Sequence, residues 1–152
     1  MTERNDIPEP LAEVLEDFEW ITDRRERTEM LIHYADQFKP VPPSIATPPY
    51  PEENRVPSCE SEAYVWAERQ DDGTMKFYFA VANPQGISAM SLAAILDMTL
   101  SGQPPEKIAN VEPDIVFKLF GNEISMGKGQ GLTSMVGMVK AYAKEQLNGG
   151  GE

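Results

Sequence analysis

The sequence predicts an α+β fold in which an antiparallel β-sheet packs against helices within a single domain. Apolar residues recur at helical spacing towards both ends of the chain, and two strand-like segments lie between them. Strands that are grouped between runs of helices, rather than alternating with them, are typical of α+β proteins. We predict a sheet made of a hairpin plus a third strand. A length of 152 residues without internal repeats suits one domain over residues 1–152, with a core over about residues 9–147.

Two helices are expected before residue 40. The first covers about residues 9–19, because its apolar side chains share one helical face and glutamates occupy the others. The second begins after Asp23, which forms a capping-box pattern with Glu26, and it ends before Lys39 and Pro40. These two helices form an antiparallel pair.

The middle of the chain contains an extended crossing followed by a β-hairpin. Residues 40–57 hold seven of the 13 prolines, which excludes a regular helix. Residues 63–69 and 75–82 are rich in aromatic and β-branched side chains, and the polar residues 71–74 between them form the turn.

The remaining segments are predicted to be helical. A central buried helix runs over residues 88–100 and ends at Gly102, and shorter helices cover residues 105–110 and 113–120. A last helix covers about residues 132–147, and the glycine-rich segment 127–131 is expected to be a loop that caps it. The Gly149–Gly151 tail is expected to be disordered.

Composition excludes several classes of function. The net charge of −12 repels nucleic acid and anionic lipid, and no apolar stretch is long enough to span a bilayer. We therefore expect neither nucleic acid nor membrane among the partners, and a location in the cytoplasm or an organelle stroma. A lone cysteine and a lone histidine, His33, exclude a disulfide scaffold and a conventional zinc site.

Cys59 is the residue most suited to chemistry. Cysteine is often a buried small hydrophobe, but this one lies among polar neighbours, directly after Pro57 and Ser58, which favours an accessible loop. Arg55 or Lys128 would favour the reactive thiolate if either lies near, whereas Glu60 and Glu62 would disfavour it. We therefore expect a thiol that reacts poorly until a partner docks.

The surroundings of Cys59 resemble the SufE family of cysteine desulfurase accessory proteins. The resemblance is carried by Glu53-Asn54-Arg55-Val56 followed by Cys59 and Ser61, by an aromatic-rich strand, and by Gln130-Gly131-Leu132 before a final helix. It covers roughly residues 9–147. The family usually has glycine before the cysteine and glutamine after it, where this chain has Ser58 and Glu60, and Lys128 replaces an arginine.

The resemblance implies a fold shared with iron–sulfur cluster scaffold proteins and a loop cysteine that accepts sulfur as a persulfide. Cys59 would be that acceptor, supported by Arg55, Ser61 and Lys128. Pyridoxal phosphate (PLP) would belong to a partner cysteine desulfurase, so no cofactor or metal is expected on this chain. The iron–sulfur scaffold complex is the expected downstream partner.

Three classes of function follow. The first is a sulfur carrier that stimulates a desulfurase and passes sulfur to iron–sulfur cluster assembly, rather than a stand-alone enzyme. The alternative is a non-catalytic module that binds and regulates a desulfurase without carrying sulfur. A thiol hydrolase or peroxidase is disfavoured, because neither a second cysteine nor a Cys-His-Asn arrangement accompanies Cys59, and His33 suits a structural or surface role.

Overall fold

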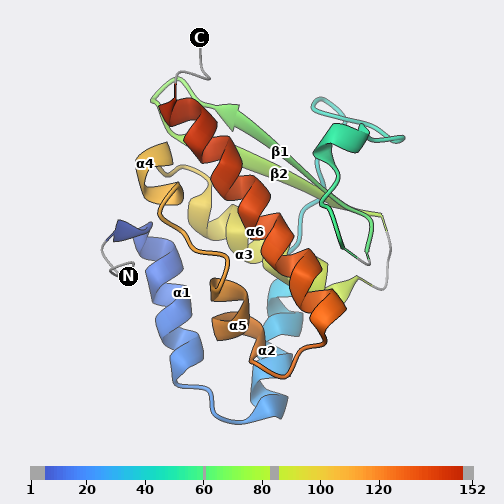
Figure 1. Cartoon of the computed structure of the whole chain (residues 1–152), viewed down its shortest axis with the longest axis vertical. Helices are drawn as coiled ribbons and strands as arrows, with labels where there is room; N and C mark the ends of the chain where they lie inside the picture. Colours follow the sequence, from blue (N-terminus) through green and yellow to red (C-terminus); the bar gives the residue numbers. More distant parts are fainter. Residues whose placement is uncertain (1–5, 60, 83–85, 149–152) are drawn as a thin grey trace.

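The structure is a computed structural model, which describes residues 6–59, 61–82 and 86–148. It confirms the α+β architecture, with helices on one side of a two-stranded antiparallel sheet (Figure 1). The elements follow in the order α1 (Glu9–Glu19), α2 (Arg24–Ala35), the 3₁₀ turn η2 (Glu52–Asn54), β1 (Ala63–Arg69), β2 (Met75–Val81), α3 (Ile87–Leu100), α4 (Pro105–Ile108), α5 (Ile115–Phe120) and α6 (Met126–Leu147). Within the described ranges, no helix is long and apolar enough to cross a membrane. The predicted tail, Gly149–Gly151, lies outside these ranges.

The hairpin has the predicted strands, but the described residues contain no third strand; isolated bridges to the hairpin are present instead. Strand β1 pairs with β2 in an antiparallel register that sets Ala63 opposite Val81. At the start of the proline-rich crossing, Pro40 forms an isolated parallel bridge to Phe79, and the Val41 N–H donates to the Phe79 carbonyl at 2.8 Å. Pairing stops there because the prolines that follow lack the N–H groups that a ladder requires.

The proline-rich crossing covers the outer face of the hairpin. Val41 is buried there together with Tyr64 and Ala80. The Tyr50 ring lies 5.0 Å from the Tyr64 ring and 5.2 Å from the Trp66 ring, measured between centroids. These aromatic contacts hold an otherwise irregular segment against the sheet, as edge-to-face ring pairs do.

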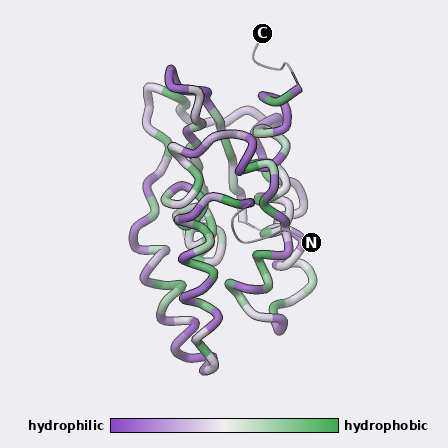
Figure 2. The backbone as a smooth tube through the Cα atoms, turned by 90° about the vertical axis from the view of Figure 1, so that its left-hand side faces the viewer, coloured by the Kyte–Doolittle hydropathy of each residue, from purple (hydrophilic) through white to green (hydrophobic). Residues whose placement is uncertain are grey.

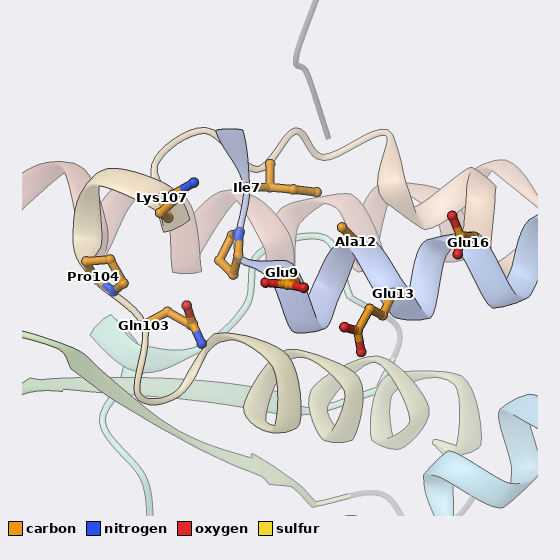
Figure 3. A pocket seen from close by; sticks show the side chains of 9 residues that line it. Ile7, Glu9, Ala12, Glu13, Glu16, Gln103, Pro104 and Lys107 are labelled. Carbon is orange, nitrogen blue, oxygen red and sulfur yellow. The ribbon is translucent and has the colours of Figure 1, made fainter. Parts of the chain in front are cut away.

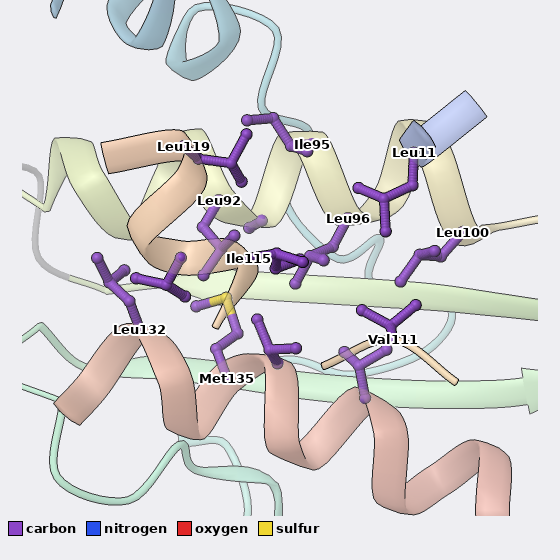
Figure 4. Close-up of a cluster of buried hydrophobic side chains, with 14 of the residues drawn as sticks. Leu11, Leu92, Ile95, Leu96, Leu100, Val111, Ile115, Leu119, Leu132 and Met135 are labelled. Carbon is purple, nitrogen blue, oxygen red and sulfur yellow. The ribbon is translucent and has the colours of Figure 1, made fainter. Parts of the chain in front are cut away.

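Helix α3 lies at the centre of the main core, as predicted. Leu92, Ile95 and Leu96 are fully buried, and Figure 4 shows side chains of α3, α5 and α6 gathered in one cluster. Along the outer helices, hydrophilic residues alternate with hydrophobic ones (Figure 2), which is the pattern of helices that bury one face. In helix α2 none of the residues is fully buried, although Leu31 and Tyr34 pack partly against the core.

The last helix begins six residues earlier than predicted, at Met126. Segment 127–131, predicted to be a loop, is helical despite its three glycines. The Ser125 hydroxyl caps this end by accepting a hydrogen bond from the Lys128 N–H at 3.2 Å. Glycine weakens a helix by only about 1 kcal/mol relative to alanine, so tertiary packing can override its propensity. Gly129 and Gly131 are both buried.

We expect Leu92→Ala to lower the free energy of unfolding by about 2–5 kcal/mol, because Leu92 is fully buried in α3 and its truncation leaves a cavity. Met98→Ala is the matched control on the same helix; its side chain is 52% exposed, so its cost should stay within about 0.5 kcal/mol. Urea unfolding followed by circular dichroism measures both values. Equal costs would contradict the central position of α3.

Candidate functional site around Cys59

The segment before Cys59 is fastened to the hairpin. The Asn54 side-chain amide donates to the Val65 carbonyl at 2.9 Å, and the Tyr142 hydroxyl of α6 donates to the same carbonyl at 3.2 Å. Val56 is buried, and its N–H donates to the Ala63 carbonyl at 2.8 Å. Two residues of the Glu53-Asn54-Arg55-Val56 motif therefore anchor the loop that carries the thiol.

The chain turns sharply at Pro57 and Ser58 immediately before Cys59. Ser58 has a backbone φ of +61°, in the left-handed region that side-chain-bearing residues seldom adopt. Glycine adopts this conformation at little cost. The turn therefore gives a physical reason why the family that this sequence resembles usually has glycine directly before the cysteine. Serine at 58 keeps the same turn with some backbone strain.

Cys59 is half-buried and lines a small cavity of about 70 Å³. One wall is Gly86 with the first residues of α3, and the other is formed by the first two turns of α6. The loop itself contributes Cys59 and Ser61. The full lining comprises Cys59, Ser61, Gly86, Ile87, Ser88, Ala89, Lys128, Gly131 and Leu132.

Three of the four predicted site residues meet at this cavity, and one does not. Cys59, Ser61 and Lys128 all line it, although Lys128 comes from a distant part of the sequence. Arg55 is absent from the lining; its guanidinium lies 3.6 Å from the Glu52 carboxylate, and its side chain is 40% exposed. The backbone of Arg55 bridges to Tyr64, so its position in the motif is explained by pairing with β1.

The acidic neighbour Glu62 is engaged away from the cavity. Its carboxylate accepts a hydrogen bond from the Tyr64 hydroxyl at 3.1 Å. Burial, and then this hydrogen bond, raise the pKa of Tyr64 above its ordinary value. Glu62 is therefore held by Tyr64 and does not line the thiol cavity. Glu60, also expected to disfavour the thiolate, lies outside the described residues.

The start of α3 is the part of the site that sequence reasoning missed. The sequence predicts a helix beginning near Ser88, yet nothing in its local pattern indicates that Gly86, Ile87 and Ala89 face Cys59. The first N–H groups of a helix have no acceptor within the helix, and its N-terminus favours negative charge. A thiolate or persulfide anion at Cys59 would therefore lie in a favourable field.

A larger pocket, of about 720 Å³, lies between α1 and the connection from α3 to α4 (Figure 3). Its lining includes Glu9, Glu13 and Glu16 on α1 and Lys107 on α4, but no residue that we predicted for the site. Carboxylates and a lysine offer no sulfur nucleophile, so the smaller cavity is the better candidate. Among the described residues, no cluster of three His, Cys, Asp or Glu side chains is arranged to hold a metal.

Comparison with known proteins points in the same direction. The family model described as "SufE: Fe-S metabolism associated domain" matches residues 12–143. The "Cysteine desulfuration protein SufE" of Plasmodium vivax is 29% identical over 68% of this chain, and the "SufE-like protein 1, chloroplastic/mitochondrial" of Arabidopsis thaliana is 24% identical over 91%. The chain spans 43% and 36% of the length of those two relatives.

An uncharacterised SufE-like protein of Mycobacterium tuberculosis matches over nearly its whole length. It is 25% identical over 95% of this chain and 99% of its own length. A hypothetical protein from Thermus thermophilus, solved in solution, superposes with a TM-score of 0.75 at 24% identity, covering 93% of this chain and 98% of that chain. This last likeness shows the shared fold.

We expect Ser58→Gly to raise the free energy of unfolding by about 0.5–1 kcal/mol, because glycine removes the cost of the left-handed backbone at this turn. Ser58→Ala is the control, since it deletes the hydroxyl and keeps the strained φ. Chemical unfolding of the three proteins measures the difference. A destabilised Ser58→Gly variant would contradict the prediction, because the strain that glycine relieves would then be smaller than the entropy that it adds to the unfolded chain.

Proposed function

Because this chain belongs to the SufE family, we propose that Cys59 accepts sulfur as a persulfide from a PLP-dependent cysteine desulfurase and passes it towards iron–sulfur cluster assembly. The observation that carries the proposal is the position of the only cysteine, half-buried in a loop and open to a cavity between two helices. One relative is named as a cysteine desulfuration protein. We place this function in the cytoplasm or an organelle stroma.

The proposed step is a thiol exchange at sulfur. The Cys59 thiolate attacks the outer sulfur of the desulfurase cysteine persulfide, so a new S–S bond forms on Cys59. The S–S bond of the donor breaks, and its electron pair leaves with the donor cysteine as a thiolate. The sulfur atom moves without any net oxidation, so the step needs no cofactor on this chain. PLP would act earlier, within the desulfurase.

The size of the cavity suits a single transferred atom. On the same measure a space of about 10–15 Å³ is enough for one water molecule, so a cavity of about 70 Å³ leaves room beside the thiol for one added sulfur atom. A persulfide that points into this space would be less exposed to solution reductants than one on an open surface. Its walls come from the beginnings of α3 and α6.

The local field of the cavity supports an anionic sulfur although the chain as a whole is acidic. The N-terminus of α3 and the positive charge of Lys128, which both line the cavity, would favour a thiolate or persulfide anion there. Residues 1–62 carry 15 acidic and 6 basic residues, a field that would steer a basic partner surface. The acidic residues of segment 1–62 would act during docking, and the local field of the cavity would act during sulfur transfer.

Exposed apolar side chains adjoin the cavity and suit contact with the desulfurase. Ile87 lines the cavity and is 47% exposed, and Met126, which is 80% exposed, begins the helix that carries Lys128. Large exposed apolar residues beside a reactive group often mark a protein interface. Docking there would cover the thiol while sulfur is transferred, and stimulate the desulfurase by removing its product sulfur.

Intact mass spectrometry tests the proposal. The protein is mixed with a cognate PLP-dependent cysteine desulfurase and L-cysteine without reductant, and we expect wild type to gain the mass of one sulfur atom. Cys59→Ser should bind the desulfurase equally and gain nothing. Binding by wild type without any adduct would instead favour a regulatory module that carries no sulfur.

Lys128→Gln should slow both sulfur acceptance and alkylation of Cys59 at pH 7 by about two- to fivefold, because losing a nearby positive charge lowers the thiolate fraction. Lys128→Arg keeps the charge and should stay within about twofold of wild type. Lys144→Gln makes the same charge change in the last turn of α6 and is the matched control. Equal rates for Lys128→Gln and Lys144→Gln would exclude Lys128 from the site.

A further inference from the structure

We propose that Gly131 is a positioning residue for sulfur transfer, because only the lack of a side chain there lets the Cys59 backbone lie against α6. The inference rests on the proposed function and adds a residue that acts through Cys59 rather than on sulfur itself. Gly131 is buried in the second turn of α6 and lines the thiol cavity. Its role depends on how closely two backbones approach.

The approach is closer than any other residue would allow. A Cβ built on Gly131 would lie 2.7 Å from the Cys59 Cα, 3.2 Å from the Cys59 Cβ and 3.2 Å from the Ser58 carbonyl oxygen. Two of these three atoms belong to the backbone, so no side-chain rotation relieves the clash. Even alanine would therefore displace the Cys59 loop or the helix. Glycine is the residue that permits such close backbone contact.

Gly129 and Gly137, which also lie in α6, do not share the need for glycine that is found at position 131. Gly137, nearly two turns further along α6, would place a Cβ in open space, with nothing within 4 Å. A Cβ on Gly129 would make only ordinary contacts, the nearest at 3.5 Å from the Ile124 Cδ1. The glycines of α6 are therefore not equivalent, and Gly137 offers a matched control for the effect of alanine on helix stability.

The opposite wall of the cavity has a close contact of a different kind. A Cβ on Gly86, the residue before α3, would lie 2.6 Å from the Ser61 hydroxyl oxygen and 3.0 Å from the Val81 Cγ1. Both of these atoms belong to side chains, and neither belongs to Cys59. Gly131 is therefore the glycine whose close approach bears directly on the Cys59 backbone.

The expected effect falls on transfer and not on docking. Alanine at 131 would displace the Cys59 sulfur by a fraction of an ångström to about 1 Å, and misplacement of a reacting group by that amount can slow a reaction up to about 100-fold. The exposed side chains proposed for docking, Ile87 and Met126, are not among the atoms that a Cβ on Gly131 would meet. The KM for this protein should therefore change less than the rate of transfer.

The experiment compares Gly131→Ala with Gly137→Ala. Single-turnover sulfur transfer from the desulfurase, followed by intact mass, should be about tenfold slower in Gly131→Ala, with the KM within about twofold of wild type. Alkylation of Cys59 by iodoacetamide should change by at least about threefold. Gly137→Ala should match wild type in all three measurements. Wild-type transfer and alkylation in Gly131→Ala would overturn the proposal.

Two further measurements decide the remaining outcomes. If Gly131→Ala does not fold, the double variant Ser58→Gly/Gly131→Ala is made, because glycine at 58 lets the loop move aside. A double variant that folds but transfers sulfur slowly supports the proposal. The proposal is overturned if the double variant transfers sulfur at the wild-type rate. It is also overturned if neither the single nor the double variant folds, because Gly131 would then be needed for folding and not specifically for positioning. If wild type takes up no sulfur, the proposed function fails, yet the alkylation comparison still tests whether Gly131 places the thiol.

Discussion

The packing of α3 against the hairpin and α6 is the constraint on which the Cys59 site depends. Nine residues of α3 are buried, so the helix has little freedom to rotate or slide without exposing apolar surface. Its first turn forms one wall of the thiol cavity, and α6, packed on the same core, forms the other. The hydrophobic core therefore fixes both walls around a loop that has little core of its own.

A shared backbone acceptor connects the loop to that framework. The Val65 carbonyl accepts hydrogen bonds from Asn54, just ahead of the loop, and from Tyr142, on α6. A tyrosine hydroxyl keeps its proton at neutral pH because its ordinary pKa is about 10, and burial raises the pKa of Tyr142 further, so this group remains a donor. This carbonyl thereby joins strand β1, the loop motif and the last helix at one point. The segment that precedes the thiol is therefore held by hydrogen bonds.

Charge acts on two scales in this protein. The chain as a whole is strongly acidic, with a net charge of −12. Among the described residues, the start of α3 and Lys128 line the thiol cavity, whereas Glu62 accepts a hydrogen bond from Tyr64 and does not line it. An acidic protein can in this way offer an environment that tolerates an anionic sulfur.

The sequence by itself determined the helices over residues 9–19 and 88–100, the hairpin, the loop position of Cys59 and the family resemblance, because these follow from periodicity and short motifs between near neighbours. Only the tertiary structure decided that α6 begins at Met126, that Arg55 lies with Glu52 away from the cavity, and that the sheet of the described residues has two strands and not three. It also decided the contact between Gly131 and Cys59. The physical reason is that these features depend on which distant segments pack together, and packing energy can override local propensity.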